Sequence, residues 1–451
     1  MVGLWVAALL LGLAVSSAAR IPELNSGKSH RTFKRRAPGL DLVTDNVVPL
    51  KPVHSVLRHH KGLLRRQSTS NGGLTAINNP SQANYVAQVG WGNETYSMIL
   101  DTGSSDTWIL KEGFQCLDST GAPTIVRVLR SLFPYQVVPN MPQQSNCQVG
   151  PQFSGNFTGG PIENVNFNIS YGTGILAGKF GWEDITIANI TVKDAQVAVV
   201  DQAYFNFNVS GLFGLAFASL TSEFPGNDPT KNIKTHYMTY EPVFYKMVDQ
   251  HLSLPTFSFA PDRDGPNGYF AVGGIPPVNT TGKTVSASIL TSKETRSKPS
   301  INRPDYYYIN IDGAIIGRSN STSSNSTSFP PFVGFVDTAT TLTLLPTALA
   351  TAIAGAFKPP ATFVAAAHLY EVPCNATAPK LAITIGGVNF PVSSADLILQ
   401  PQVDGSTGLC VVGFQDGGGE YILGATFLNN VLSTFDLGAL EVRFTALAQK
   451  L

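Results

Sequence analysis

The sequence contains little charge, few cysteines and no long apolar run beyond its first residues. Only 13% of its 451 residues are charged, and only 4 are cysteine. There is no CxxC pair and no histidine-rich cluster, so we expect no zinc site and no other metal or cofactor. No later segment approaches the roughly 20 apolar residues of a transmembrane helix. The C-terminal "EVRFTALAQKL" also lacks the apolar tail of a lipid-anchor signal. We therefore expect no membrane anchor.

What the chain does contain favours a large protein built mostly from β-strands. Hydrophobic residues make up 43% of it, with 42 glycines and 30 prolines. From about Ser81, short apolar runs with alternation or β-branched residues, broken by turn residues, indicate strands. The few helical signals include 241–252 and 346–357, each with a proline near its start. A chain this long exceeds a single compact domain, so two lobes are expected.

The N-terminus, the cysteines and the sequons all indicate secretion, to the extracellular space or to a vacuole. Residues 1–19 resemble a signal peptide, although a buried N-terminal strand is an alternative. Four cysteines fit two disulfides; of three possible pairings we favour the local ones, Cys116–Cys147 and Cys374–Cys410. The candidate glycosylation sites are Asn93, Asn156, Asn168, Asn189, Asn208, Asn279, Asn320, Asn325 and Asn375.

Residues 20–66 form a basic segment in front of an acidic body. The segment has 11 Lys/Arg against 3 Asp/Glu, a net charge of +8; since the chain has 30 of each, 19 basic and 27 acidic residues remain, a net of −8. A disordered tail or a nucleic-acid arm would share this composition, but secretion argues against nucleic acid. The dibasic pair Arg65 and Arg66 suggests processing, with a mature start near Gln67. We interpret 20–66 as a propeptide that acts as an intramolecular inhibitor and is released by acid.

Two stretches repeat one design: "SMILDTGSSDTWIL" at 97–110 and "GFVDTATTLTLLP" at 334–346. Each has an apolar run, Asp-Thr, a small residue and then hydroxyl residues. Each is followed later by a similar glycine motif, "SGLFGLAF" at 210–217 and "EYILGATF" at 420–427. The repeat predicts two pseudo-symmetric lobes, 67–265 and 266–451, each supplying one aspartate to their junction.

Two apposed carboxylates would allow acid–base chemistry without a metal. At about 3 Å they cannot both ionise readily and share a proton, so one can activate water while the other donates to a carbonyl. That suits amide hydrolysis at acid pH. The residues around Asp101 and Asp337 would support them. Ser104 and Thr340 would donate hydrogen bonds to the carboxylates, and Thr102 and Thr338 would form hydrogen bonds across the junction. Gly103 would permit a tight loop.

At these residues the chain resembles the pepsin-like aspartic proteases, particularly secreted fungal ones. The resemblance covers roughly 81–445 and rests on "ILDTGSSDTW", "SYGTG", "GLFGLAF", "FVDTATT" and "ILGATF" in family order. It implies a mostly β, bilobal pepsin-like fold with the active-site cleft between the lobes. It also implies an aspartic endopeptidase made as a zymogen, with polypeptide substrates and a monomeric state.

The resemblance also assigns a flap and a substrate pocket. Tyr171, Gly172 and Thr173 would belong to the flap hairpin, with the Tyr171 hydroxyl bonded to Trp108. A threonine at 173, where lysine-accepting relatives carry an acid, predicts a preference for hydrophobic residues around the cleaved bond. The residues that would line the pocket, or else pack in the core, are Ile99, Leu212, Tyr204, Phe205 and Phe207.

The second motif departs from the family at Ala339, where glycine is usual. A methyl group is harmless at negative φ but strains a loop that needs positive φ. This departure keeps open a weak or inactive pepsin-fold protein that binds a protein or polysaccharide. A glycosidase with paired carboxylates would not explain the duplicated motifs and could be detected by sugar release. A structural cell-wall glycoprotein would explain the sequons but not the ordered motifs.

Overall fold

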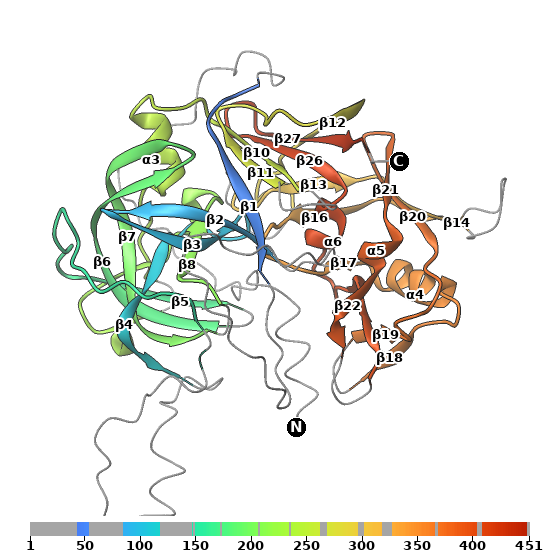
Figure 1. Ribbon diagram of the computed structural model, residues 1–451, viewed down its shortest axis with the longest axis horizontal. Coiled ribbons are helices and arrows are strands. Elements are labelled where there is room, and N and C mark those ends of the chain that lie inside the picture. Colours follow the sequence, from blue (N-terminus) through green and yellow to red (C-terminus); the bar gives the residue numbers. More distant parts are fainter. Residues whose placement is uncertain are drawn as a thin grey trace, which may run out of the picture.

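The computed structural model describes residues 43–53, 84–117, 147, 149–171, 174–205, 208–233, 236–261, 268–295, 302–317, 327–365, 369–403 and 408–448. The predictions that lie outside these residues concern the signal peptide 1–19, most of the segment 20–66 including Arg65 and Arg66, Gly172, Thr173, Phe207, Asn320 and Asn325. In the described part the chain is mostly strands, in two lobes that lie side by side (Figure 1). No helix described here is long and apolar enough to cross a membrane.

The first lobe is built from eight strands of one large sheet. They are β2 (Asn84–Trp91), β3 (Glu94–Asp101), β4 (Trp108–Cys116), β5 (Val165–Tyr171), β6 (Gly174–Ile187), β7 (Ile190–Tyr204), β8 (Gly211–Gly214) and β9 (Glu223–Pro225). The short 3-10 helices η1 (Ala218–Leu220) and η2 (Pro229–Lys231) and the helix α3 (Val243–Asp249) follow or flank them. The helix predicted at 241–252 is confirmed as α3, and Pro242 is its N-cap.

The second lobe contains three smaller sheets and also completes the large one. The strands it adds to the large sheet are β10 (Thr256–Ala260), β11 (Gly268–Val272), β12 (Thr280–Ser288), β26 (Val431–Asp436) and β27 (Glu441–Leu447). The smaller sheets comprise β13 (Tyr308–Ile311), β14 (Gly313–Gly317), β15 (Thr327–Ser328), β16 (Phe332–Val336), β17 (Thr343–Leu345), β18 (Thr362–Val364), β19 (Leu369–Val372), β20 (Lys380–Ile385), β21 (Val388–Val392), β22 (Ile398–Val403), β23 (Cys410–Val412), β24 (Phe414–Asp416) and β25 (Ile422–Leu423). The helices are α4 (Thr347–Ala356), which confirms the helix predicted at 346–357, α5 (Ser394–Leu397) and α6 (Ala425–Leu428).

The strand β1 (Val47–Val53) lies inside the basic segment 20–66 and runs between the lobes (Figure 1). Its first half pairs antiparallel with β11, and its second half pairs antiparallel with β2. The basic segment is therefore joined to the body by backbone hydrogen bonds, in the part of the large sheet that connects the two lobes.

The two aspartate motifs have the same local topology, which confirms the repeat seen in the sequence. In the first lobe β3 pairs parallel with β8, so that Asp101 lies opposite Gly214, and β8 also pairs with β4. In the second lobe β16 pairs parallel with β25, placing Val336 opposite Leu423, and β25 also pairs with β17. A Cβ on Gly214 or Gly424 would lie within 2.3 Å of neighbouring backbone atoms, so both glycines are required by close approach of the backbone.

Contacts between the lobes are mainly buried and apolar. Within the large sheet that connects the lobes, Phe257 on β10 stacks on Phe435 of β26 with ring centroids 4.9 Å apart. Across the junction, the Tyr307 ring lies 4.9 Å from that of Phe217, and the Tyr307 hydroxyl donates to the Leu215 carbonyl at 2.5 Å. These contacts fix how the two aspartate loops face each other.

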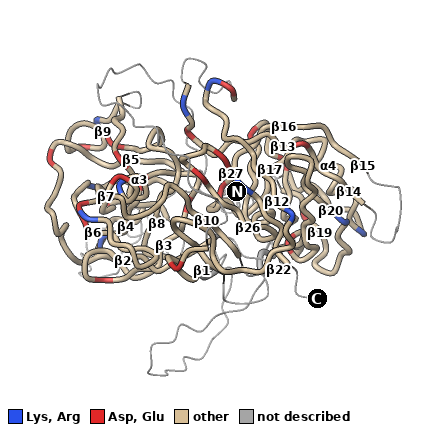
Figure 2. The backbone as a smooth tube through the Cα atoms, turned by 90° about the horizontal axis from the view of Figure 1, so that it is seen from above, with Lys and Arg blue, Asp and Glu red and all other residues tan. Residues whose placement is uncertain are grey.

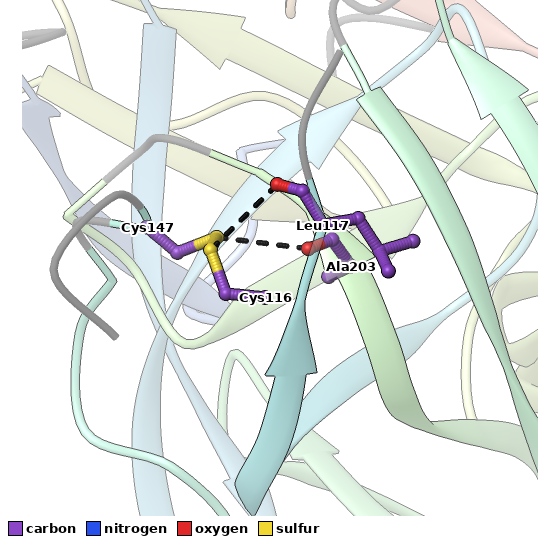
Figure 3. Close-up of a disulfide and its surroundings, with 4 residues drawn as sticks. All are labelled: Cys116, Leu117, Cys147 and Ala203. Carbon is purple, nitrogen blue, oxygen red and sulfur yellow. Dashed lines mark hydrogen bonds between the residues drawn. A yellow bond between two sulfur atoms is a disulfide. The ribbon is translucent and has the colours of Figure 1, made fainter. Parts of the chain in front are cut away.

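Charged residues are scattered over both lobes rather than gathered on one face (Figure 2). Two ion pairs in the described part of the chain, Lys193–Asp184 and Lys231–Asp228, both have exposed lysines. The two disulfides join the predicted pairs, Cys116–Cys147 and Cys374–Cys410. Figure 3 shows the first of these beside β7, with the Cys147 sulfur 3.6 Å from the Ala203 carbonyl oxygen. It thereby secures the end of β4.

Candidate active site

Asp101 and Asp337 lie together at the junction of the two lobes. Asp101 ends β3 and Asp337 follows β16 directly, so each is held by the parallel strand pair of its own lobe. Their exposed fractions are 1% and 0%, and their carboxyl groups are hydrogen-bonded to each other. The structure thus brings together two residues that are 236 positions apart in the sequence, as the repeat predicted.

Two threonines lock the loops to each other with reciprocal hydrogen bonds. The Thr102 N–H donates to Thr338 Oγ1 and the Thr338 N–H donates to Thr102 Oγ1, both at 3.0 Å. Each hydroxyl then donates to a carbonyl of the opposite lobe, Thr102 to Val336 at 3.0 Å and Thr338 to Leu100 at 2.7 Å. Because every group in this set is buried and satisfied, the relative position of the two carboxyl groups is rigid.

Each carboxyl group receives the same pair of donors from its own loop. The Gly103 N–H donates to Asp101 Oδ1 at 2.7 Å, and the Ala339 N–H donates to Asp337 Oδ1 at 2.9 Å. The hydroxyls of Ser104 and Thr340 donate to the Oδ2 atoms. The outer edge of the carboxyl pair is therefore fixed by the protein.

Burial raises the pKa of Asp101 well above its usual range, and the negative charge of Asp337 raises it further. Burial likewise raises the pKa of Asp337. The donors named above oppose both shifts, because they stabilise the ionised form. The pair consequently retains a proton above the pH at which an isolated aspartate loses it.

Gly103 and Ala339 occupy equivalent positions but differ in what surrounds them. A Cβ on Gly103 would lie 2.8 Å from the Asp337 carboxyl atoms, closer than real contacts allow. Ala339 has a negative φ, and its side chain is buried in the apolar cluster that contains Trp108 and Tyr171. The methyl group that departs from the family pattern is thus accommodated without backbone strain.

Tyr171, at the end of β5, is linked to Asp101 through hydrogen-bonded side chains. The Trp108 indole N–H donates to the Tyr171 hydroxyl at 3.0 Å, as the family resemblance implied. That hydroxyl also hydrogen-bonds to Ser104, which donates to Asp101. Trp108 itself is fully buried and packs edge-on against Phe205, with ring centroids 5.0 Å apart.

The predicted pocket residues pack beneath this chain of hydrogen bonds. Ile99 and Leu212 lie opposite each other on β3 and β8, and both are fully buried, as is Phe205. Tyr204, at the end of β7, is partly exposed. In this structure the three buried side chains support Trp108 and Tyr171 and have no open surface of their own.

Sequence reasoning did not identify Asp106, which lies within the first motif and is fully buried. Its Oδ1 accepts hydrogen bonds from the Tyr240 hydroxyl at 2.7 Å and the Ser222 N–H at 3.0 Å. Burial raises its pKa to about 6. Its main partner is 134 residues away, so no local pattern could have predicted this contact.

Six of the seven described sequons carry exposed asparagines: Asn93, Asn156, Asn189, Asn208, Asn279 and Asn375. Asn168 on β5 is half-buried, and its amide donates to the Pro229 carbonyl at 3.4 Å. Asn168 is thus the least accessible acceptor among them.

Comparisons with known proteins agree with this geometry. Residues 84–447 match the model of the family described as "Eukaryotic aspartyl protease". A probable aspartic-type endopeptidase from Aspergillus fumigatus is 34% identical over 81% of this chain and 79% of its own length. Aspergillopepsin-1 from Aspergillus flavus is 24% identical over 98% of each chain.

A solved structure has the same fold. The crystal structure of an aspartic proteinase from Irpex lacteus matches with a TM-score of 0.57 and 20% identity, over 81% of this chain and 95% of that one. Together with the duplicated topology, these similarities show that the chain has the bilobal pepsin-like fold, belongs to the eukaryotic aspartyl protease family and is an aspartic-type endopeptidase.

Proposed function

We propose that this chain is a secreted endopeptidase that cleaves polypeptides at acid pH, with Asp101 and Asp337 as its catalytic dyad. The single observation that carries the proposal is the buried, mutually hydrogen-bonded carboxyl pair, whose pKa values are both raised. A pair that holds one proton can act as base and acid at once.

In this mechanism the ionised carboxylate takes a proton from a bound water, whose oxygen attacks the carbonyl carbon of the peptide bond. The protonated carboxyl donates its hydrogen bond to the carbonyl oxygen. When the C–N bond breaks, the amine nitrogen takes up a proton and the dyad returns to its singly protonated form. Tyr171, held by Trp108, would help exclude water while the substrate is bound.

The proposed preference for hydrophobic residues rests on the apolar surroundings of the first aspartate. Ile99, Leu212 and Phe205 form an apolar floor under Tyr171. A flap that carries Thr173 also adds no charge to attract a lysine before the cleaved bond. A cleavage-site profile dominated by lysine at that position would contradict this preference.

The proposal that residues 20–66 form an inhibitory propeptide is supported by charge and by β1. The segment carries +8 against −8 in the rest of the chain, and β1 pairs with strands of the body. Body carboxylates paired with its cations would have pKa values below the usual range. Their stabilisation would be present above the unfolded pKa and lost as the pH falls through about 5 to 3.

Both parts of the proposal can be tested on purified protein. The mature chain should degrade an unfolded protein at pH 4 and not at pH 7, and pepstatin, which resembles the transition state of this family, should abolish the activity. A variant in which Arg65 and Arg66 are both replaced by serine should keep residues 20–66 attached at pH 5.5 and remain inactive there towards a peptide that the mature chain cleaves at the same pH. Equal activity of the attached and mature forms would contradict the inhibitory role, while leaving the dyad intact.

A further inference from the structure

Glu420 lies beside the second aspartate but takes no part in the proposed chemistry. It directly precedes Tyr421 and β25, the strand that runs parallel to β16. The Phe335 N–H donates to the Tyr421 carbonyl at 3.0 Å, and the Asp337 N–H donates to the Leu423 carbonyl at 3.1 Å. The backbone that follows Glu420 is therefore fixed relative to Asp337.

The segment that follows Glu420 packs among aromatic side chains. The Tyr421 ring contacts Phe332, with centroids 5.6 Å apart, on one face of the sheet. Ile422, on the opposite face, packs in the cluster that contains Phe335. Glu420 itself lies just outside β25, directly after the turn at residues 418–419, and its N–H donates to the Gly417 carbonyl at 3.0 Å.

On the face that Ile422 occupies, Tyr306 and Tyr308 lie 4.9 and 5.2 Å from the Phe335 ring, and both tyrosines are partly exposed. Glu420 lies close enough to Tyr308 to raise the pKa of its hydroxyl. An aromatic wall next to a carboxyl group thus borders the second aspartate.

The pseudo-symmetry of the two lobes locates this group relative to a bound substrate. Phe335 lies two residues before Asp337, as Ile99 lies two residues before Asp101, and each is paired with the corresponding residue of the glycine motif, Ile422 or Leu212. The family resemblance assigns Ile99 and Leu212 to the residue before the scissile bond. The equivalent group of the second lobe then faces the residue after it.

Glu420 is acidic and partly buried, and within the described residues it has no ion-pair partner. The titratable groups that act on it or on its neighbour Tyr308 are Asp337, Tyr306 and Asp305. Burial, and then the charge of Asp337, raise the pKa of Glu420. A cation placed here would therefore relieve an unfavourable charge.

We propose that Glu420 is a specificity-determining residue that binds a lysine or arginine side chain of the substrate at the position directly after the scissile bond. The aliphatic stem of that side chain would lie along the partly exposed rings of Tyr306 and Tyr308, and its charged end would reach the Glu420 carboxylate. This inference rests on the proposed endopeptidase function and refines it: the residue before the bond is apolar and the residue after it is basic.

The preference has a defined pH dependence. The carboxylate attracts a cation only when it is ionised, and its raised pKa means that ionisation is completed above the usual range for glutamate. Discrimination in favour of a basic residue should therefore grow as the pH rises from 3.5 to 5.5, even where the overall activity declines.

The test compares two peptides that differ only in the residue after the scissile bond, lysine in one and norleucine in the other. With the mature chain at pH 5.5 we expect kcat/KM to be at least tenfold higher for the lysine peptide, with a smaller ratio at pH 3.5. Glu420→Gln should bring the ratio to within twofold of one at both pH values and leave cleavage of the norleucine peptide within threefold of wild type. Glu441→Gln, the same substitution at a partly exposed glutamate of β27, serves as the control and should leave the ratio unchanged.

Each other result contradicts the proposal in a distinct way. If Glu420→Gln leaves the lysine preference intact, the cation is bound elsewhere. If it changes both peptides equally and moves the pH optimum, Glu420 acts through Asp337 and not on the substrate. If wild type cleaves neither peptide and shows no pepstatin-sensitive degradation of an unfolded protein at pH 4, the proposed function itself has failed.

Discussion

At the residue scale, the two loops that hold the aspartates show why one motif tolerates a side chain that the other excludes. Position 103 has no room for a methyl group because the Asp337 carboxyl is 2.8 Å from where it would be. Position 339 accepts one at negative φ, in an apolar cluster. The sequence identified the departure at Ala339, but only the backbone angle and the neighbours show its consequence.

This asymmetry predicts opposite outcomes for two reciprocal substitutions. Gly103→Ala should displace the Asp337 carboxyl and lower kcat/KM by about a hundredfold or more, since a misplacement of about 1 Å has effects of this size. Ala339→Gly should keep kcat/KM within about threefold and reduce the free energy of unfolding by about 1 kcal/mol, through the greater freedom of the unfolded chain. Peptide kinetics and urea denaturation measure both quantities. Equal losses of activity in the two variants would be inconsistent with the geometry described.

Asp106 gives a prediction for stability against pH. Its pKa is raised to about 6 in the folded protein by burial, so the folded state holds its proton more tightly than the unfolded state does. Asp106 thus leaves the free energy of unfolding unchanged below about pH 4, the pKa of its carboxyl group in the unfolded chain. The free energy of unfolding then decreases as the pH rises from about 4 to about 6. At about 1.4 kcal/mol per pKa unit, the loss is on the order of 3 kcal/mol.

Asp106→Asn should remove this loss while keeping an oxygen that accepts from Tyr240 and Ser222. The free energy of unfolding, measured by urea at pH 4.0 and pH 6.5, should therefore fall less in the variant than in wild type. If the difference between variant and wild type is the same at both pH values, Asp106 does not titrate in this range.

At the element scale, β5 and β6 present Tyr171 over the first aspartate, and Trp108 on β4 fixes its hydroxyl. Tyr171→Phe would leave the buried Trp108 N–H without its acceptor and remove the bond to Ser104. We expect the free energy of unfolding to fall by about 1–3 kcal/mol and kcat/KM to fall at least tenfold. Denaturation and peptide kinetics on the one variant provide both values. If Tyr171→Phe has the same kcat/KM as the wild type, the hydrogen bond between Trp108 and Tyr171 has no part in closing the site.

The elements also show where sequence reasoning succeeds and where it fails. The helices at 241–252 and 346–357 were predicted because a proline near the start and an apolar stripe are local signals. The strand β1 was not predicted, because residues 20–66 were interpreted from their charge; Pro49 and Pro52 are also unusual inside a sheet. The structure explains the exception. Residues 47–50 pair only with β11 and residues 51–53 only with β2. At each residue one edge of the strand is therefore unpaired, and a proline, which has no N–H to donate, is tolerated there.

At the scale of the whole molecule, the duplicated motifs were sufficient to predict two lobes and the meeting of Asp101 with Asp337. They could not show that one sheet extends through both lobes, since β10 pairs with β26 and β12 pairs with β27 through contacts far apart in the sequence. Nor could the motifs predict that Tyr240 hydrogen-bonds to Asp106 or that Glu420 lies near Asp337. Pairings of this kind depend on the complete fold and not on any local pattern.

The central claim is that one proton shared by Asp101 and Asp337 drives peptide hydrolysis. The most direct measurement is the pH dependence of kcat/KM for a single apolar peptide, in the wild type and in Asp101→Asn and Asp337→Asn. We predict a bell-shaped profile with its maximum at acid pH for the wild type. Each variant should be folded, as judged by its melting curve, and have kcat/KM at least a thousandfold lower at every pH. A folded variant that retains a tenth or more of wild-type activity would contradict the account.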